Sequence, residues 1–550
     1  MKKAIFLTLA AIAALTTKSF ACTNFIVTKG ASTDGSVMVS YSADSHQLYG
    51  CLYKYTPAEY HPNQMVDIYE WDTGKFLGKI PQAKTTYSTV GNMNEHQLVI
   101  GETTFTGREE LQDSTGIMDY GSLIYITLQR AKTAREAVKI FVDLANDYGY
   151  HSTGESISIA DPNEAWLLEL IGKGCNIEGG KNTNKGIVWV AMRIPDGYVC
   201  AHANCARIGK FDRNDPENVL YAPDVISFAR EKGYFSGKDD DFNFRDAYAP
   251  LDFGAMRACE ARVWSFFRSV ASGMDKYVDY AMGHNPNNPM PVWVKPDKKV
   301  SPKQVFDAMR DHFEGTPMDM TTDIGAGGSY LPYRWRPMQW EVDGKEYVNE
   351  RATATQQTGF WFVSQSRSWL PDPVGGILWF GVDDAATSCL TPIYSSSTRV
   401  PECLREGNGH MTEYSPTASF WIFNRVAQFA YLRYDYIGAE VRKVVDRWEN
   451  DKLDEVKSVD AMALNEKDPR KTLTDYSVNT AEELFTKWNA LDKYLLVKYI
   501  DGNIKKEDEK GFVDNGSGKH IPAMPDQPGY SEKWKRAVAA DNGEILKVVK

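Results

Sequence analysis

Residues 22–44, CTNFIVTKGASTDGSVMVSYSAD, put a cysteine at the start of a strand–turn–strand pattern. β-Branched and apolar residues flank KGASTDGS, whose glycine, aspartate and serine residues are typical of a hairpin loop. Cys22 should therefore open the first strand of an antiparallel sheet. The segment before it limits what this cysteine can be, because that segment reads as an export signal.

Residues 1–21 read MKKAIFLTLAAIAALTTKSFA. Two lysines form a basic start, residues 4–15 form a short apolar run, and Ser19 and Ala21 are the small residues that signal peptidase reads. About a dozen apolar residues are too few to span a bilayer, and no later stretch is long and uncharged enough to do so. We expect an exported protein, periplasmic or secreted, without a membrane span, that begins at Cys22.

Composition excludes several classes of function. The formal net charge of -11 is opposite to the basic surface that a nucleic-acid-binding protein needs. The sequence has no HExxH, GxSxG or complete phosphate-loop motif, no CxxC, and no Cys/His cluster with zinc spacing. It therefore predicts neither a metal nor an organic cofactor. Export permits disulfides, and Cys389 with Cys403 is the local pair that we expect first.

Paired strands and separate helices follow along the chain. Residues 155–170 and 185–208 each read as a hairpin around a short turn, DPNE and PDG. Residues 125–145 carry helical spacing, and residues 358–397 read as further strands. The chain then becomes charged and helical, most clearly over residues 481–500. Strands paired by short turns, with helices grouped between and after them, indicate an α+β layered fold.

A thiol at the first residue of a mature chain has its own α-amine as a neighbour. Such an amine has a pKa of about 7.7 to 8.0, so it is partly neutral near pH 7 and can take the thiol's proton without a histidine. Cys22 meets this requirement if the signal is cut before it. Lipidation and a structural disulfide are the alternatives. Lipoprotein processing also leaves an N-terminal cysteine, but it favours an aliphatic residue at the position that Ser19 occupies here.

The residues from Cys22 onward resemble the N-terminal-nucleophile dipeptidases, the dipeptidase A family of cysteine peptidases. The resemblance starts with CTNFIVTKGASTDGSVMVSYSAD and continues in family order through NEHQLVIGETTF, ADPNEAWLLE, IPDGYVCAHANCARIG, RDHFEGTPMDMT, YRWRP and LWFGVDDAA. It implies an αββα sandwich of four layers and hydrolysis of dipeptides to free amino acids through a thioester on Cys22. The chain is more distantly similar to bile-salt hydrolases and penicillin V acylases.

The resemblance also implies a division of the chain. Residues 1–21 would be the signal peptide and residues 22–427 the N-terminal-nucleophile hydrolase domain. Residues 428–550 would form a C-terminal helical extension packed on the core, with a loosely held tail.

The relation to the acylases implies supporting residues for Cys22. Asp44 matches the aspartate that orients the α-amine, and Asn204 matches the asparagine near the α-amine and the oxyanion site. Arg262 matches an arginine that lies against the thiol and favours the thiolate.

Two positions depart from the acylase pattern. This chain has Tyr41 where the acylases carry an arginine, and it has Thr103 or Thr104 where their second oxyanion asparagine falls. The backbone N–H of Thr103 could take the place of that second donor.

A dipeptide carries a free ammonium and a free carboxylate, and each needs a partner of opposite charge. From position alone, Glu102 is the candidate for the ammonium, and Arg193 or Arg334 for the carboxylate. We therefore expect an exported cysteine dipeptidase that uses no cofactor, with a homo-oligomer left open. One alternative is an amidase of the same fold acting on acyl amides. An alternative of another class is a peptide-binding surface lipoprotein anchored through Cys22.

Overall fold

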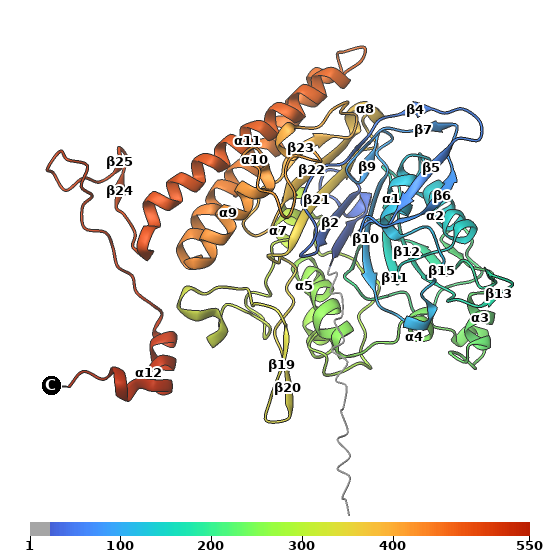
Figure 1. Cartoon of the computed structure of the whole chain (residues 1–550), viewed down its shortest axis with the longest axis horizontal. Helices are drawn as coiled ribbons and strands as arrows, with labels where there is room; N and C mark the ends of the chain where they lie inside the picture. The colour runs from blue at the N-terminus through green and yellow to red at the C-terminus, as the bar shows by residue number, and fades with distance from the viewer. Residues whose placement is uncertain (1–21, 550) are drawn as a thin grey trace, which may run out of the picture.

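Two antiparallel sheets form the centre of the computed structural model, which describes residues 22–549 (Figure 1). The expected signal peptide lies outside the described residues. The first sheet has seven strands, in the order β18 (Trp293–Val294), β16 (Val199–His202), β1 (Thr23–Val27), β2 (Met38–Asp44), β21 (Thr358–Ser366), β22 (Gly376–Val382) and β23 (Thr391–Tyr394). The second has eight, in the order β17 (Val219–Tyr221), β15 (Ile187–Arg193), β12 (Ala165–Gly172), β11 (Gly154–Ala160), β10 (Val99–Phe105), β9 (Met93–Asn94), β8 (Thr89–Val90) and β3 (Lys54–Tyr55).

Helices cover the outer faces of both sheets (Figure 1). The second sheet is covered by α1 (Tyr120–Leu128) and α2 (Ala134–Tyr148). The first is covered by α5 (Ala261–Val270), α6 (Val278–Ala281), α7 (Pro302–Ala308) and α10 (Ala439–Ala463), with α9 (Ser419–Leu432) and α11 (Arg470–Tyr499) packed beside β22 and β23. Shorter helices are α3 (Val225–Glu231), α4 (Phe244–Tyr248) and α8 (Asp372–Gly375).

Apolar side chains that alternate between the two faces of each strand fill the spaces between these layers. In β1, Phe25 and Val27 belong to the apolar cluster under α5, whereas Ile26 belongs to the cluster between the sheets. Successive side chains of a strand point to opposite faces, so a strand between two covered faces is buried on both. The predicted α+β class is confirmed, and so is the hairpin of residues 23–44, which pairs β1 with β2.

The hairpin predicted for residues 185–208 is wrong. β15 pairs with β12 in the second sheet, whereas β16 pairs with β1 in the first. The PDG turn therefore carries the chain from one sheet to the other. Stacked sheets are about 10 Å apart, a gap that a five-residue connection can bridge.

The single helix predicted for residues 125–145 is also wrong. α1 ends at Leu128, and α2 begins at Ala134 after Thr133, whose side chain accepts a hydrogen bond from the Glu136 N–H. The T-x-x-E pattern at this point is a capping signal that marks a helix start.

The expected disulfide between Cys389 and Cys403 is wrong as well. All eight cysteines lie within the described residues and are free thiols. β23 separates the two members of the pair, and the Cys403 thiol donates instead to the Ala481 carbonyl oxygen at 3.7 Å.

A π-helical turn, Ala255–Glu260, leads without a break into α5.

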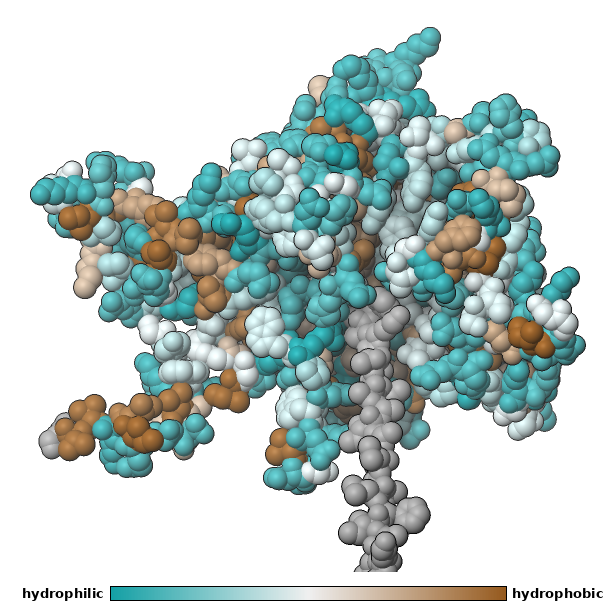
Figure 2. Space-filling model, in the orientation of Figure 1, coloured by the Kyte–Doolittle hydropathy of each residue, from teal (hydrophilic) through white to brown (hydrophobic). Residues whose placement is uncertain are grey.

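Beyond α11 the chain forms a small hairpin, β24 (Glu507–Asp508) with β25 (Gly511–Phe512), and then α12 (Glu532–Leu546), in which no residue is buried. Figure 2 shows hydrophobic side chains exposed along this arm at the lower left. Ile545 and Leu546 of α12 are exposed. The division of the chain into domains stays a prediction.

A buried ion pair joins α10 to Arg310, which directly follows α7 and also contacts the segment after β22. Arg310 donates to Glu449 of α10 at 2.5 and 3.1 Å, and both side chains are almost fully buried. The same guanidinium donates to the carbonyl oxygens of Ala385 at 2.9 Å and Ser388 at 3.3 Å.

We expect Glu449→Ala to lower the free energy of unfolding by about 3 to 5 kcal/mol, because it leaves the Arg310 charge buried without its carboxylate. Guanidinium titration followed by circular dichroism measures this change. Asp454→Ala is the control on the same helix, since its pair with Lys457 is exposed, and it should change stability by less than about 0.5 kcal/mol. A loss below about 1 kcal/mol for Glu449→Ala would contradict the prediction.

Candidate active site

Cys22 directly precedes β1 and lies between the two sheets, with 6% of its surface exposed. Its Sγ is 3.8 Å from the hydroxyl of Tyr41 on the neighbouring β2. Burial raises the pKa of the thiol well above its ordinary value, and the charges of Glu102 and Asp44 raise it further. A thiol in this environment is protonated, so it needs a nearby base before it can act as a nucleophile.

The second sheet reaches Cys22 through a close approach at Gly101 of β10. A Cβ atom at this position would lie 2.4 Å from Asn24 Oδ1 and 3.4 Å from the Tyr41 Cβ. Asn24 Nδ2 also donates to the Glu102 carbonyl oxygen at 2.6 Å. Glycine is therefore the residue that lets β10 come close enough to bring Glu102 beside the thiol.

Glu102 is buried at this contact, with 1% of its surface exposed. The Tyr41 hydroxyl donates to Glu102 Oε1 at 2.6 Å, so Tyr41 connects the carboxylate to the Cys22 sulfur. Burial raises the pKa of Glu102, although hydrogen bonds from Tyr41 and Cys22 oppose the rise. The structure thus brings Glu102 and Cys22 together.

Arg262 of α5 is 1% exposed and holds the start of β1 in place. Its Nη1 donates to the Cys22 carbonyl oxygen at 2.6 Å and to Thr23 Oγ1 at 2.8 Å. Its Nη2 donates to the Ala203 carbonyl oxygen at 3.2 Å and to Asn204 Oδ1 at 3.0 Å. The guanidinium contacts the carbonyl oxygen of Cys22 rather than the sulfur, which indicates that it positions the chain rather than stabilising a thiolate.

Asn204 follows β16, and its side-chain oxygen accepts a hydrogen bond from Arg262. Its φ of 59° is in the left-handed region, which asparagine adopts more readily than most residues. Its Nδ2 donates to the Thr104 carbonyl oxygen at 2.7 Å, and this bond links the end of β16 to β10. An amide NH2 has two donors, so the group can bind a further acceptor.

Asp44 ends β2 and is 1% exposed. Arg351 Nη2 donates to its Oδ2 at 2.5 Å, and Thr358 Oγ1 donates to its Oδ1 at 2.6 Å. The Ser42 hydroxyl donates to Oδ2 at 3.0 Å. These donors hold the buried carboxylate in place at the edge of the site.

The two arginines expected to bind the substrate carboxylate are engaged elsewhere. Arg193 donates to Asn218 Oδ1 at 2.8 Å and to Glu164 Oε2 at 3.4 Å, on a surface that also includes Thr28, beyond the far end of β1 from Cys22. Arg334 donates to the Met320 carbonyl oxygen and forms an ion pair with Asp323. These contacts support neither assignment, and both stay predictions.

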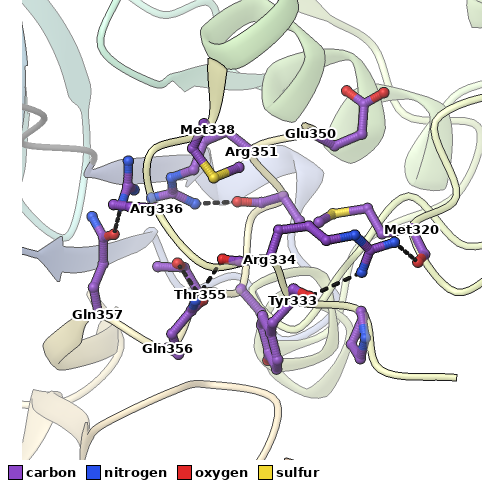
Figure 3. Close-up of a pocket in the computed structure, with 13 residues that line it drawn as sticks. Met320, Tyr333, Arg334, Arg336, Met338, Glu350, Arg351, Thr355, Gln356 and Gln357 are labelled. Atoms are coloured by element: carbon purple, nitrogen blue, oxygen red, sulfur yellow. Dashed lines mark hydrogen bonds between the residues drawn. The ribbon is translucent and has the colours of Figure 1, made fainter. Parts of the chain in front are cut away.

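Arg336, two residues after Arg334, lies closer to Asp44. Figure 3 shows Arg334, Arg336 and Arg351 around one pocket, in which Arg336 donates to Gln357 Oε1 at 2.7 Å. Burial and the neighbouring Arg351 lower the pKa of Arg336 to about 10, while the Asp44 charge opposes this shift. Two adjacent guanidinium groups of this kind are stabilised by an incoming anion.

The side chain of Thr103 contacts a buried histidine, whereas the prediction for this residue concerned its backbone N–H. Its Oγ1 is 2.7 Å from Nδ1 of His202, whose Nε2 is 2.6 Å from the Ser158 hydroxyl. His202 belongs to the first sheet, and Thr103 and Ser158 belong to the second. The hydrogen bonds of the buried His202 side chain therefore link the two sheets beside the site.

Sequence reasoning missed Arg351 and the position of Arg336. Arg336 stands in the quoted YRWRP block, so the pattern contained it without distinguishing it from Arg334. Arg351 follows a small exposed hairpin, β19 (Gln339–Val342) with β20 (Lys345–Val348), and no local pattern connects it to Asp44.

Among the described residues, no three His, Cys, Asp or Glu side chains are grouped so that they could hold a metal ion. No helix between residues 22 and 549 combines the length and the apolar composition that crossing a membrane requires.

Comparison with known proteins identifies relatives over most of the chain. The model of peptidase family C69 matches residues 21–66 and 54–447. A probable dipeptidase of Salmonella dublin is 24% identical over 399 residues, which cover 68% of this chain and 81% of the relative. A probable dipeptidase of Latilactobacillus sakei is 22% identical over 522 residues, covering 88% and 98%. A probable dipeptidase B of Streptococcus pyogenes serotype M1 is 20% identical over 502 residues, covering 87% and 93%.

His202 should make the fold sensitive to acid. Burial, with a smaller effect of Arg207, lowers the pKa of His202 to about 3, below the value of about 6.5 for an unfolded chain. The unfolded chain therefore takes up the proton first, so the contribution of neutral His202 is complete above pH 6.5 and is lost as the pH falls towards 3.

Between pH 7 and pH 5 this linkage should remove about 2 kcal/mol of stability. We expect His202→Gln to lose less stability over that interval than the wild type, by about this amount, in urea titrations at the two pH values. The exposed His61→Gln is the control and should keep the wild-type pH dependence. Equal pH dependence in all three proteins would contradict the prediction.

Proposed function

The chain belongs to peptidase family C69 and is a cysteine-type peptidase, and from this premise we propose that it is an exported dipeptidase with Cys22 as its nucleophile. One observation carries the proposal. Because Thr23 of β1 pairs with Ser42 of β2, Asp44 lies level with the position just before Cys22. If the signal is removed before Cys22, the new α-amine lies beside a buried carboxylate.

The reaction then follows from these groups. The α-amine takes the Sγ proton, Sγ attacks the scissile carbonyl carbon, and a tetrahedral oxyanion forms. The C–N bond breaks as the α-ammonium gives the proton to the leaving amine, and the first amino acid is left as a thioester on Cys22. Water, activated by the α-amine, hydrolyses the thioester and restores the thiol.

Three side chains support this reaction. Asp44 holds the α-amine in orientation, and Arg262 fixes the Cys22 backbone. The second amide hydrogen of Asn204 binds the oxyanion, a contact worth about 3 to 4 kcal/mol in a comparable site. We assign the two sheets and their covering helices to the N-terminal-nucleophile sandwich, the fold that such chemistry uses.

Glu102 is the partner of the substrate ammonium. In a dipeptide the α-nitrogen is two bonds from the scissile carbonyl carbon, which is about 2.5 Å given the standard bond lengths. A carboxylate that binds this ammonium must therefore lie within a few ångströms of Sγ. Glu102 meets this condition through Tyr41, whose hydroxyl contacts both groups.

We assign the binding of the substrate carboxylate to Arg336 instead of Arg193 or Arg334. Its proximity to Arg351 and Asp44 supports this choice, because an incoming carboxylate would relieve the repulsion between the two guanidinium groups.

The state of the N-terminus tests the proposal first. Protein expressed with its signal intact in an exporting host should yield an N-terminal peptide that starts at an unmodified Cys22, as measured by mass spectrometry. This chain should hydrolyse members of a dipeptide panel, and Cys22→Ala should not.

A matched control is the same chain with one uncleavable glycine before Cys22, which keeps the thiol and blocks the amine. Its activity should fall at least about 100-fold, since general-base catalysis contributes roughly 10²- to 10⁴-fold. A diacylglyceryl group on Cys22 without dipeptide turnover would instead favour the peptide-binding lipoprotein.

The second test concerns Glu102. A charge-assisted hydrogen bond contributes about 1.5 to 3 kcal/mol, so Glu102→Gln should lower kcat/KM for free dipeptides about 10- to 100-fold. Hydrolysis of N-acetylated dipeptides, which lack the ammonium, should change far less. Glu164→Gln, which removes a carboxylate beside Arg193, is the control and should leave both rates unaltered. An equal loss on the two substrate classes would refute the assignment.

A further inference from the structure

A second buried carboxyl group lies next to Glu102. In the pairing of β10 with β11, Thr104 stands opposite Glu155, and Glu102 is two residues before Thr104 on the same strand. Glu102 and Glu155 are therefore diagonal neighbours on one face of the sheet. Thr104 Oγ1 donates to Glu155 Oε1 at 2.9 Å and is 3.5 Å from Glu102 Oε2, so it lies between the two carboxyl groups.

One oxygen of this pair lacks a donor. Glu155 is 0% exposed, and its Oε2 has no hydrogen-bond partner among the described residues. A buried carboxylate oxygen without a donor is costly, whereas a protonated oxygen can donate to a neighbouring carboxylate. Glu102 is that neighbour.

The groups around the pair do not neutralise two negative charges. From the packed elements, those that act on it are Cys22 before β1, Tyr41 of β2, Asp72 in the turn between β5 (Met65–Tyr69) and β6 (Phe76–Pro81), Tyr120 of α1, and Tyr150 before β11. Farther out are Asp44 beside Cys22 and Asp119 beside Tyr150. None of these groups is a cation. The thiol and the phenols can donate hydrogen bonds to a carboxylate, whereas the neighbouring acids disfavour a second negative charge.

Burial and the charge of Glu102 accordingly raise the pKa of Glu155 well above its ordinary value. Two carboxyl groups this close cannot both ionise in a buried site, so they titrate as a pair that keeps one proton.

We propose that Glu102 and Glu155 together form the ammonium site, which holds one shared proton when empty and releases it to solvent when a substrate α-ammonium group binds. This inference rests on the proposed function. The balance is simple: a singly protonated pair and an ammonium ion become an ammonium ion held by two carboxylates, plus one free proton. Glu155 is a specificity-determining residue here, because a neutral N-acyl group brings no charge to displace the proton.

The site therefore selects substrates with a free, protonated amino terminus. An N-acylated substrate would leave the shared proton in place and would lack the cation that makes the second ionisation favourable. This preference separates a dipeptidase from an acyl amidase by the charge of one buried pair rather than by the shape of the pocket.

The experiment counts protons. Cys22→Ala removes both turnover and the thiol as a proton source, and it is titrated at pH 7 with the best substrate of a dipeptide panel in phosphate and in Tris. The difference in binding enthalpy between buffers of unlike ionisation enthalpy gives the protons released. We expect about one proton per dipeptide, and none when Glu155→Gln is added.

Glu164→Gln in the same background is the matched control, since it removes a carboxylate from the turn between β11 and β12, and it should keep the release. The N-acetylated form of the dipeptide should bind more weakly and release no proton. Unchanged release in the Glu155→Gln background, or dipeptide binding without release in Cys22→Ala itself, overturns the inference.

A second measurement does not depend on how the Glu155 variant folds. The infrared difference spectrum of Cys22→Ala should lose a protonated-carboxyl band when the dipeptide binds, and an unchanged carboxyl region overturns the inference. Failure of the proposed function is distinguishable, because it would appear as an absence of turnover by the wild-type chain on every dipeptide.

Discussion

One guanidinium group, that of Arg262, connects the elements on which the site depends. It binds the carbonyl oxygen of Cys22 at the start of β1, the side chain of Thr23 and, beyond β16, both Ala203 and Asn204. Arg262 itself comes from α5, on the outer face of the first sheet. A buried arginine with this many acceptors is fixed in geometry. In the proposed mechanism, this single side chain therefore positions the nucleophile Cys22 and the oxyanion donor Asn204 relative to each other.

The sequence predicts those parts of the site that lie in continuous strands. Cys22, Asp44 and Glu102 stand in β1, β2 and β10 or directly beside them, and the predicted hairpin of residues 23–44 sets the register of the first two. Glu155 and Arg351 were beyond this reasoning, because their positions depend on pairing between strands and on the path of a long connection. The same limit explains the error at residues 185–208, where a turn pattern is identical whether the next strand continues the sheet or crosses to the other.

Charged side chains lie on two sides of Cys22, with acids on one side and arginines on the other. Glu102 and Glu155 lie towards the second sheet, whereas Arg336 and Arg351 lie beyond Asp44. A dipeptide has charges of the complementary sign at its two ends. Under the proposed function, this division would both orient the substrate and limit its length, since a longer peptide would carry its terminal carboxylate past the arginines.

The π-helical turn before α5 has a consequence of its own. A π-helical turn accommodates one residue more than the α-helical turn it replaces, and such insertions are frequent at functional sites. Each residue of an α-helix turns the chain by about 100°, so the extra residue within Ala255–Glu260 sets the rotational phase of α5. Deleting one residue there would regularise the helix and swing the Arg262 side chain about a quarter of a turn away from Cys22. The position of Arg262 thus depends on this one-residue insertion, which a regular α-helix would lack.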